Sequence, residues 1–163
     1  MKVITAPEAL LEVIPGLPCI FLAGSIEQDK AVNWQQRVIS QLGDLNGTIL
    51  NPRRVEWDAS WNEDDPRFIE QVNWELSAMR RADIIMMHFE PDTMSPITLL
   101  ELGLYHDSGK LYVSCPKGYW RRGNVRIVCA SSWVRVHDSL QELLETVRDV
   151  VKRNYYAAAD LSY

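Results

Sequence analysis

Hydrophobic positions along the chain fall into short continuous runs, separated by longer stretches of mixed character. Several of these runs end at glycine, proline or a small polar residue, as in Cys19–Ala23, which is followed by Gly24. A short run without polar alternation is typical of a strand buried on both faces of a parallel sheet. We therefore predict five strands, at residues 19–23, 48–52, 83–89, 111–115 and 125–129.

The stretches between these runs carry helix signals. Asp65–Pro66 and Ser95–Pro96 each pair a capping side chain with a proline suited to the first helical turn. Strands that alternate with helices predict an α/β fold with a doubly wound, Rossmann-like or flavodoxin-like sheet, five-stranded and mainly parallel, with helices on both faces. No linker or repeat separates a second part, so we predict one domain over residues 1–163. The predicted helices are 31–42, 65–81, 95–108 and 140–153.

Composition and charge narrow the function classes. With 47% hydrophobic and 24% charged residues, the chain has the composition of a folded globular protein. Its net charge of -5 disfavours a binder of polymeric nucleic acid, which needs a basic surface. No apolar stretch reaches the roughly 20 residues of a membrane span, and no signal-peptide pattern opens the chain. Three cysteines without metal-site spacing are typical of buried thiols, so we expect a cytoplasmic protein that contacts no membrane.

Candidate chemistry lies where the predicted strands end, because ligands of open α/β sheets bind beyond the carboxyl ends of the strands. Glu101 follows such an end and lies among apolar residues of the helix that starts after Ser95–Pro96. Its carboxylate either faces solvent or is held in the interior by a partner, since unpaired burial is costly. The local pattern leaves both interpretations open.

Four short motifs follow one another along the chain: Phe21–Ile26, Trp74–Leu76 with Ala82–Ile84 after it, Ser95–Pro96 leading to Glu101–Gly103, and Gly123–Val125. In their order and spacing they resemble the motifs of the nucleoside 2-deoxyribosyltransferases and the related deoxynucleoside 5'-phosphate N-hydrolases. The resemblance spans about residues 20–129.

The resemblance implies catalytic roles for two glutamates. In that family the glutamate that matches Glu101 attacks the anomeric carbon and forms a covalent glycosyl-enzyme, as carboxylates do in retaining glycosidases. Glu75 stands where the family has an aspartate that helps the base depart, and its side chain is one methylene longer. The alternative for Glu75 is an ordinary helix-surface glutamate.

Ser95 bears on the choice between nucleoside and nucleotide. At this position the transferases carry an aspartate that binds the sugar 5'-hydroxyl, whereas the 5'-phosphate hydrolases carry a serine. However, Glu27 and Asp29 lie in the turn after the first predicted strand and would repel a phosphate. We therefore favour a nucleoside, with Ser95 and Asp92 on its 5'-hydroxyl. The simpler alternative for Ser95 is a helix cap.

Further substrate contacts are expected from residues around the strand ends. Gly24, followed by Ser25, allows a close approach of backbone and ligand, and Phe21 or Trp57 offers an aromatic face for the base. Asn124 matches an asparagine that in the family reaches the neighbouring subunit's site, which implies a homo-oligomer.

No cofactor or metal is expected. The histidines lack partners at ligand spacing, no glycine-rich dinucleotide or phosphate motif is present, and the family uses neither kind of group. The expected partners are therefore a nucleoside or nucleotide and a free base. The sequence predicts transfer on 2'-deoxynucleosides. The alternatives are hydrolysis of a nucleoside 5'-monophosphate, cleavage of the nicotinamide glycosidic bond of NAD by a related enzyme, or a non-catalytic nucleotide-binding module.

Overall fold

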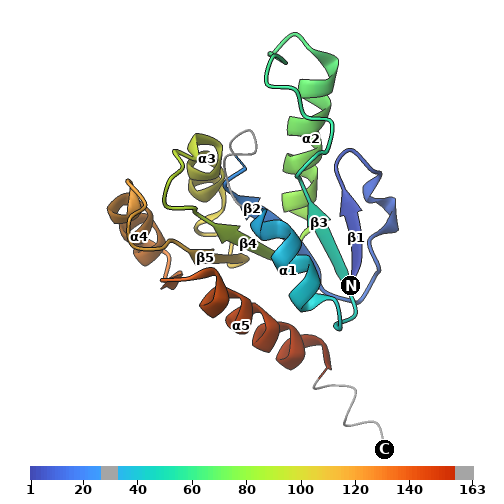
Figure 1. The fold of residues 1–163 in the computed structure, drawn as a ribbon. Coiled ribbons are helices and arrows are strands. Elements are labelled where there is room, and N and C mark those ends of the chain that lie inside the picture. Colours follow the sequence, from blue (N-terminus) through green and yellow to red (C-terminus); the bar gives the residue numbers. More distant parts are fainter. Residues whose placement is uncertain (27–32, 157–163) are drawn as a thin grey trace, which may run out of the picture.

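The computed structural model describes residues 1–26 and 33–156 and contains a six-stranded parallel sheet in the order β1-β3-β2-β4-β5-β6 (Figure 1). The strands are β1 (Lys2–Thr5), β2 (Cys19–Gly24), β3 (Thr48–Asn51), β4 (Ile84–His88), β5 (Leu111–Ser114) and β6 (Val136–His137). The helices are α1 (Trp34–Leu42), α2 (Pro66–Arg81), α3 (Pro96–Tyr105), α4 (Arg122–Ser131) and α5 (Leu140–Val151). Two short segments add a 3-10 helix at Leu10–Glu12 and a π-helix at Lys152–Tyr156.

Side chains of the central strands alternate between two hydrophobic cores, one on each face of the sheet. Phe21 and Met87 point to the core built with α2, α3 and α4, whereas Leu22 and Met86 point to the core built with α1 and α5. All four are fully buried. Because both faces of these strands are covered, their sequences are continuously apolar.

The sheet reverses its strand order between β2 and β4. The chain runs from β2 outward to β3 through α1, and then crosses back over β2 to β4 through α2. Such a switch point leaves a crevice at the carboxyl ends of the two strands, which is where ligands of this fold class bind. Residues 24–26 and 88–96 therefore border the expected binding region.

The structure confirms the doubly wound α/β fold and corrects two features of the predicted sheet. The prediction of a strand at 125–129 is wrong, because these residues belong to α4. Val125 and Cys129 are buried one helical turn apart while Arg126 and Ile127 are exposed, which is the helical period. The edge strands β1 and β6 were not predicted. Of the helix predicted from residue 31, the described part begins at Trp34, and residues 31 and 32 lie outside the described residues.

Within residues 1–26 and 33–156, no helix is both long and apolar enough to cross a membrane. In the same part of the chain, no group of three or more histidine, cysteine, aspartate or glutamate residues is placed to hold a metal ion.

Gly24 at the end of β2 is required by a close approach to β4. Its φ is +146°, and an added Cβ would lie 2.3 Å from the His88 carbonyl oxygen and 2.8 Å from Cζ2 of Trp34. We expect Gly24→Ala to lower the free energy of unfolding by roughly 2 kcal/mol or more, because neither backbone nor ring can yield freely. Urea unfolding measures this loss.

Gly103→Ala is the matched control, because an added Cβ at Gly103 meets nothing within 4 Å and the residue lies inside α3. This variant should be stabilised by about 0.5–1 kcal/mol through helix propensity. Equal unfolding midpoints for the two variants would show that the approach of His88 does not require glycine.

Candidate active site

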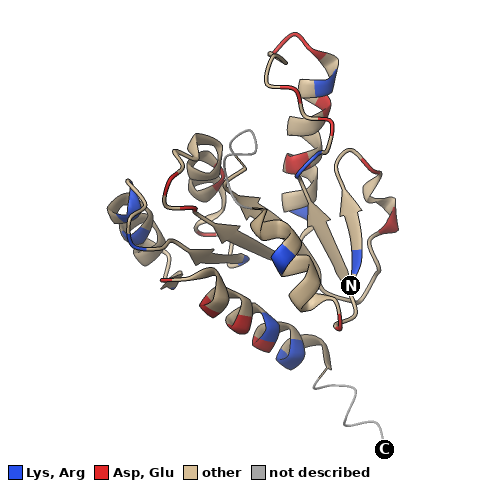
Figure 2. Cartoon of the chain, in the orientation of Figure 1, with Lys and Arg blue, Asp and Glu red and all other residues tan. Residues whose placement is uncertain are grey.

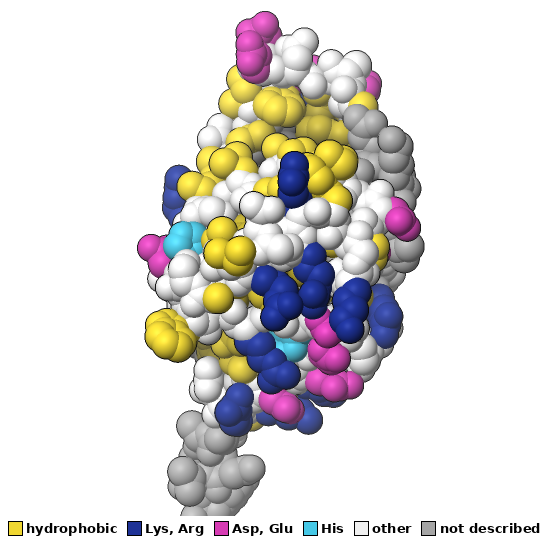
Figure 3. Space-filling view, turned by 90° about the vertical axis from the view of Figure 1, so that its left-hand side faces the viewer, with side chains coloured by type: hydrophobic (Ala, Val, Ile, Leu, Met, Phe, Trp, Pro, Cys, Tyr) yellow, Lys and Arg dark blue, Asp and Glu magenta, His cyan; other side chains and the backbone are white. Residues whose placement is uncertain are grey.

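A cavity of about 590 Å³ lies between α2, α3 and the loop after β3. Most of its lining is apolar, and its size suits a nucleoside-sized ligand. Figure 3 shows hydrophobic side chains gathered in the upper part of the face seen there, below the acidic tip of the molecule. The cavity is lined by Ile26, Pro52, Arg54, Trp57, Phe68, Gln71, Val72, Glu75, Leu76, Met79, Met94, Ser95, Pro96, Ile97, Thr98, Leu100, Glu101 and Leu104.

Two carboxyl groups enter this cavity from different helices, Glu75 from α2 and Glu101 from α3. Glu101 is 7% exposed. Burial, reinforced by the negative charge of Glu75, raises the pKa of Glu101 to about 8. Burial also raises the pKa of Glu75, and a hydrogen bond from Gln71 opposes this rise. Ionising both carboxyl groups in an apolar site costs much free energy, because two like charges would lie close together. The pair therefore retains one proton at neutral pH.

Gln71 connects the pair to the loop after β3. It lies one helical turn before Glu75, and its Nε2 donates hydrogen bonds to the Pro52 carbonyl at 2.8 Å and to Oε1 of Glu75 at 2.9 Å. The amide therefore holds the Glu75 carboxyl group at a fixed place on the cavity wall. Glu101 has no such fixed neighbour among the hydrogen bonds of the described residues.

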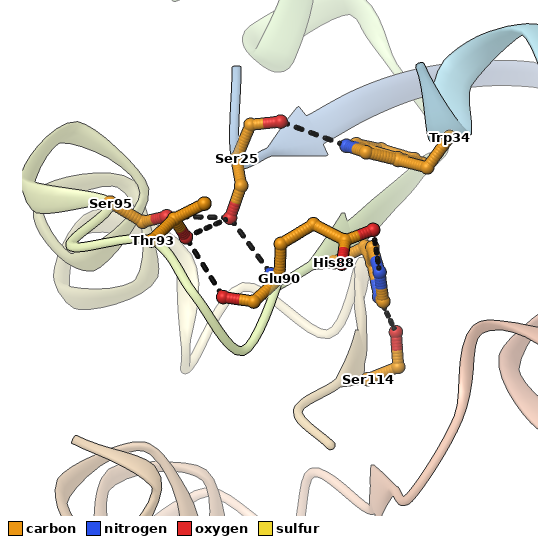
Figure 4. Close-up of polar contacts among 7 residues, drawn as sticks. All are labelled: Ser25, Trp34, His88, Glu90, Thr93, Ser95 and Ser114. Carbon is orange, nitrogen blue, oxygen red and sulfur yellow. Dashed lines mark hydrogen bonds and ion pairs between the residues drawn. The ribbon is translucent and has the colours of Figure 1, made fainter. Parts of the chain in front are cut away.

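Three hydroxyl groups meet beside the cavity, at the carboxyl ends of β2 and β4 (Figure 4). The Oγ atom of Ser95 lies 2.5 Å from that of Ser25 and 2.7 Å from Oγ1 of Thr93. Ser25 also accepts a hydrogen bond from the backbone N–H of Glu90, and Thr93 donates one to the Glu90 carbonyl. Ser95 has a left-handed backbone, with φ 46°, and occupies the N-cap position of α3 without capping it through its side chain. Its hydroxyl is thus held at the cavity by other hydroxyls, and the prediction of a simple helix cap does not describe it.

His88 supports this cluster from the end of β4. Its Nδ1 lies 2.6 Å from Oγ of Ser114, and its Nε2 lies 3.1 Å from Oε1 of Glu90 (Figure 4). The contact with His88 holds the pKa of Glu90 below its ordinary value. Trp34 packs edge-on against His88 and donates to the Ser25 carbonyl. These residues hold the hydroxyl cluster in place beside the cavity, and their side chains do not line the cavity.

Aromatic side chains form the outer wall on the α2 side. Trp57 packs edge-on against Trp61 at a ring distance of 5.2 Å and lies 6.1 Å from Phe68. The guanidinium group of Arg54 lies over the Trp61 ring and donates to Glu70. Trp57 and Phe68 line the cavity and could stack on a planar ring. Figure 2 shows acidic residues gathered around the loop at the start of α2.

The structure brings four of the predicted site residues together in the cavity lining: Glu101, Glu75, Ser95 and Trp57. The other predicted site residues do not line it.

Phe21 is fully buried and packs against Trp74, with ring centroids 6.5 Å apart. The close approach of Gly24 is to His88, and Ser25 reaches the cavity only through Ser95. Asp92 is exposed. Asn124 is exposed on α4 and not in a turn, and it lies outside its own chain's cavity. Glu27 and Asp29 lie outside the described residues.

Sequence reasoning missed Gln71, Phe68 and Arg54 as cavity residues. A signal for two of them was present, because Phe68 and Gln71 precede Glu75 by about two turns and one turn of the same helix. Residues at this spacing share a helix face, so Phe68 and Gln71 are expected to line any cavity that Glu75 lines. Arg54 lies in an irregular loop, where no period predicts which side chains face inward.

The arrangement offers a carboxylate that can attack, a second carboxyl group that can carry a proton, and an aromatic wall. A carboxylate nucleophile and a proton donor in one largely apolar cavity are the parts needed to displace a leaving group in two steps. Ser95 adds a fixed hydroxyl for hydrogen bonding to a polar substrate.

Comparisons with known proteins bear on the fold and the family of the chain. A crystal structure of a conserved protein from Enterococcus faecalis V583 has the same fold, with a TM-score of 0.58 and 13% sequence identity over 82% of this chain and 98% of that chain. No curated protein matches the sequence. The sequence model of the family described as "Nucleoside 2-deoxyribosyltransferase like" matches residues 18–119, which include β2 to β5 and both cavity glutamates. The chain therefore belongs to the nucleoside 2-deoxyribosyltransferase-like family.

Proposed function

We propose that the protein cleaves the N-glycosidic bond of a 2'-deoxynucleoside and transfers the sugar to another base through a covalent intermediate on Glu101. The observation that carries this proposal is the convergence of Glu101 and Glu75, from different helices, on one largely apolar cavity. Membership of the nucleoside 2-deoxyribosyltransferase-like family supports a nucleoside as the substrate.

In the first step, an oxygen of ionised Glu101 forms a bond to C1' of the sugar. The C1'–N bond breaks, its electron pair goes to the base, and Glu75 gives its proton to a ring nitrogen of the base. In the second step, a nitrogen of the incoming base attacks C1' and its proton passes to Glu75. The electron pair of the C1'–O bond returns to Glu101, so both carboxyl groups are restored.

This reaction needs the charge on Glu101 and the proton on Glu75. Within the protein alone the hydrogen bond from Gln71 favours the opposite distribution, because it stabilises the ionised form of Glu75. A base that presents a ring nitrogen to Glu75 favours protonated Glu75, and the shared charge then moves to Glu101. Substrate binding therefore ionises Glu101 and makes it a nucleophile. When no base lies in the cavity, Glu101 keeps its proton and does not attack.

Hydrolysis of a nucleoside 5'-monophosphate is the second candidate. It is favoured by Arg54 at the cavity and by the N-terminus of α3, whose first turn lines the cavity without a side-chain cap. Against it, acidic residues outnumber basic ones in residues 53–67. Such a rim repels a dianion.

Incubation with deoxyadenosine and a different free base, followed by chromatography, tests the proposal. Transfer yields a new deoxynucleoside, hydrolysis yields free sugar and base, and deoxyadenosine 5'-monophosphate in a parallel reaction identifies a nucleotide enzyme. If no product forms with any base of a panel, both catalytic proposals are excluded and the protein is a non-catalytic binding module.

We also propose that the active form is a homo-oligomer in which Asn124 serves a neighbouring subunit. Its exposed place on α4, away from its own cavity, supports this arrangement. Sedimentation of the same preparation tests it, and a monomer with full activity would contradict it.

A further inference from the structure

Large hydrophobic side chains lie exposed along the outer side of α3 and the loop before it. Met94, Ile97, Leu100 and Leu104 are 54%, 59%, 61% and 54% exposed, and we call these four side chains the apolar band. The one charged residue of α3 is Glu101, which is buried. The helix is therefore apolar on every side, which is typical of helices that are covered all round. An exposed apolar patch with charged flanks marks an interaction surface.

Exposed carboxylates gather at one end of the apolar band, in the loop that leads into α2 (Figure 2). Between Arg54 and Arg67 the sequence contains no Lys or Arg. Four carboxylates of this loop are exposed and form no ion pair within residues 1–26 and 33–156. This acidic surface consists of Glu56, Asp58, Glu63 and Asp64.

Exposed cations gather around α4, below the apolar band in Figure 3. No Asp or Glu occurs between Asp107 and Asp138. Arg122 in this segment is paired with Asp138, but four other cations are exposed and form no ion pair with any residue of the described ranges. This basic surface consists of Lys117, Arg121, Arg126 and Arg135.

The three surfaces follow one another on the same side of the molecule. Figure 3 shows an acidic tip at the top, hydrophobic side chains below it, and Lys and Arg side chains further down. A face with this order is complementary to itself after a rotation by 180° about an axis through the apolar band. The acidic surface of each copy then meets the basic surface of the other, and the two bands meet at the axis. A two-fold contact of this kind is the commonest in protein assemblies, and an apolar centre with a charged rim is the usual anatomy of an interface.

We propose that this face binds the same face of a second copy of the chain and that the contact closes the cavity of each copy. The inference rests on the proposed homo-oligomer and names the surfaces that meet in it. All four side chains of the apolar band also line the cavity, so the second copy forms its outer wall. Asn124 is exposed on α4, within the basic surface, and the rotation carries it to the acidic rim of the other copy's cavity.

Charge reversal tests this contact. Arg121→Glu with Arg126→Glu puts two carboxylates on the basic surface, and Glu63→Lys with Asp64→Lys puts two cations on the acidic surface. In either variant like charges meet at both ends of the dimer. We therefore expect each variant alone to dimerise at least about 100-fold more weakly than the wild type. Sedimentation equilibrium measures the dissociation constants.

An equimolar mixture of the two variants should recover the wild-type dissociation constant to within about tenfold. In the mixed dimer two unchanged surfaces of opposite charge meet at one end, and the two reversed surfaces meet at the other. Recovery in the mixture also shows that both variants fold. Lys152→Glu with Arg153→Glu is the matched control, because these exposed residues follow α5, which packs on the other face of the sheet. This control should dimerise like the wild type.

A monomeric wild type, an assembly with an odd number of subunits, or charge-reversed variants that dimerise like the wild type would overturn the inference. So would a mixture that stays monomeric while both variants keep the circular dichroism spectrum of the wild type. Single-stranded DNA is the other candidate for the basic surface, although the acidic surface beside it repels phosphates. Binding of a fluorescent oligonucleotide by a monomeric wild type, lost in Arg121→Glu with Arg126→Glu, would assign the basic surface to nucleic acid instead.

Turnover of deoxyadenosine by the same preparations separates the interface from the proposed reaction. If the dimer forms through these surfaces but turns over no nucleoside, the interface stands and the catalytic proposal is wrong. If a monomeric wild type is fully active, the catalytic proposal stands and the interface is wrong. When both are correct, each charge-reversed variant alone should lose at least about tenfold in kcat/KM and the mixture should regain it, because the second copy excludes water from the cavity.

Discussion

Glu101→Gln should abolish formation of the sugar adduct and lower kcat by at least about a thousandfold, because removing a nucleophile removes the whole covalent route. Glutamine has the size of glutamate and no negative charge, so the cavity keeps its shape and loses only the attacking oxygen. Intact-protein mass spectrometry after mixing with deoxyadenosine detects the adduct on the wild type, and chromatography gives kcat.

Glu145→Gln is the control, because Glu145 is exposed on α5 at the opposite face of the sheet, where it accepts a hydrogen bond from Gln141. This variant should retain wild-type kcat. An adduct or near-normal turnover in Glu101→Gln would exclude Glu101 as the nucleophile, even if the protein cleaves nucleosides by another route.

Local rules predicted the helices that carry the two glutamates, whereas the resemblance to the family identified Glu75 and implied the role of Glu101. Asp65–Pro66 and Ser95–Pro96 start α2 and α3, and both helices flank β4 on the same face of the sheet. Two helices that share a strand neighbour bring their facing side chains together. Glu75 and Glu101 therefore meet although they are far apart along the chain.

Other features depend on tertiary contacts that no local pattern reveals. Val125–Cys129 has the composition of a strand, and only the burial of its first and last residues against the core makes it helical. Phe21 is directed to its core by the register of β2, which an unbroken apolar run does not specify. The left-handed backbone of Ser95 accompanies hydroxyl contacts with Ser25 and Thr93, which come from two different loops.

The same substitution, Glu101→Gln, should stabilise the protein at alkaline pH. The pKa of Glu101 is about 8 in the folded protein, whereas the ordinary value for glutamate is 4.5. Between these two pH values the folded state holds a proton that the unfolded chain has released, so wild-type stability falls as pH rises through this window. Above it the folded protein carries the full cost of burying the charge.

Glutamine does not ionise, so the variant avoids this loss. The gain in the free energy of unfolding over wild type should be small near pH 4.5 and should grow to about 3–5 kcal/mol above pH 8, by linkage at ~1.4 kcal/mol per pKa unit. Urea unfolding of the wild type and the variant at pH 5 and pH 8.5 measures this gain. The difference between the two free energies of unfolding removes the contribution of every group that titrates in both proteins. Glu145→Gln should show no such pH-dependent gain, since Glu145 is exposed. A gain that is the same at both pH values would mean that Glu101 is ionised in the folded protein throughout, and that its burial is compensated by a partner.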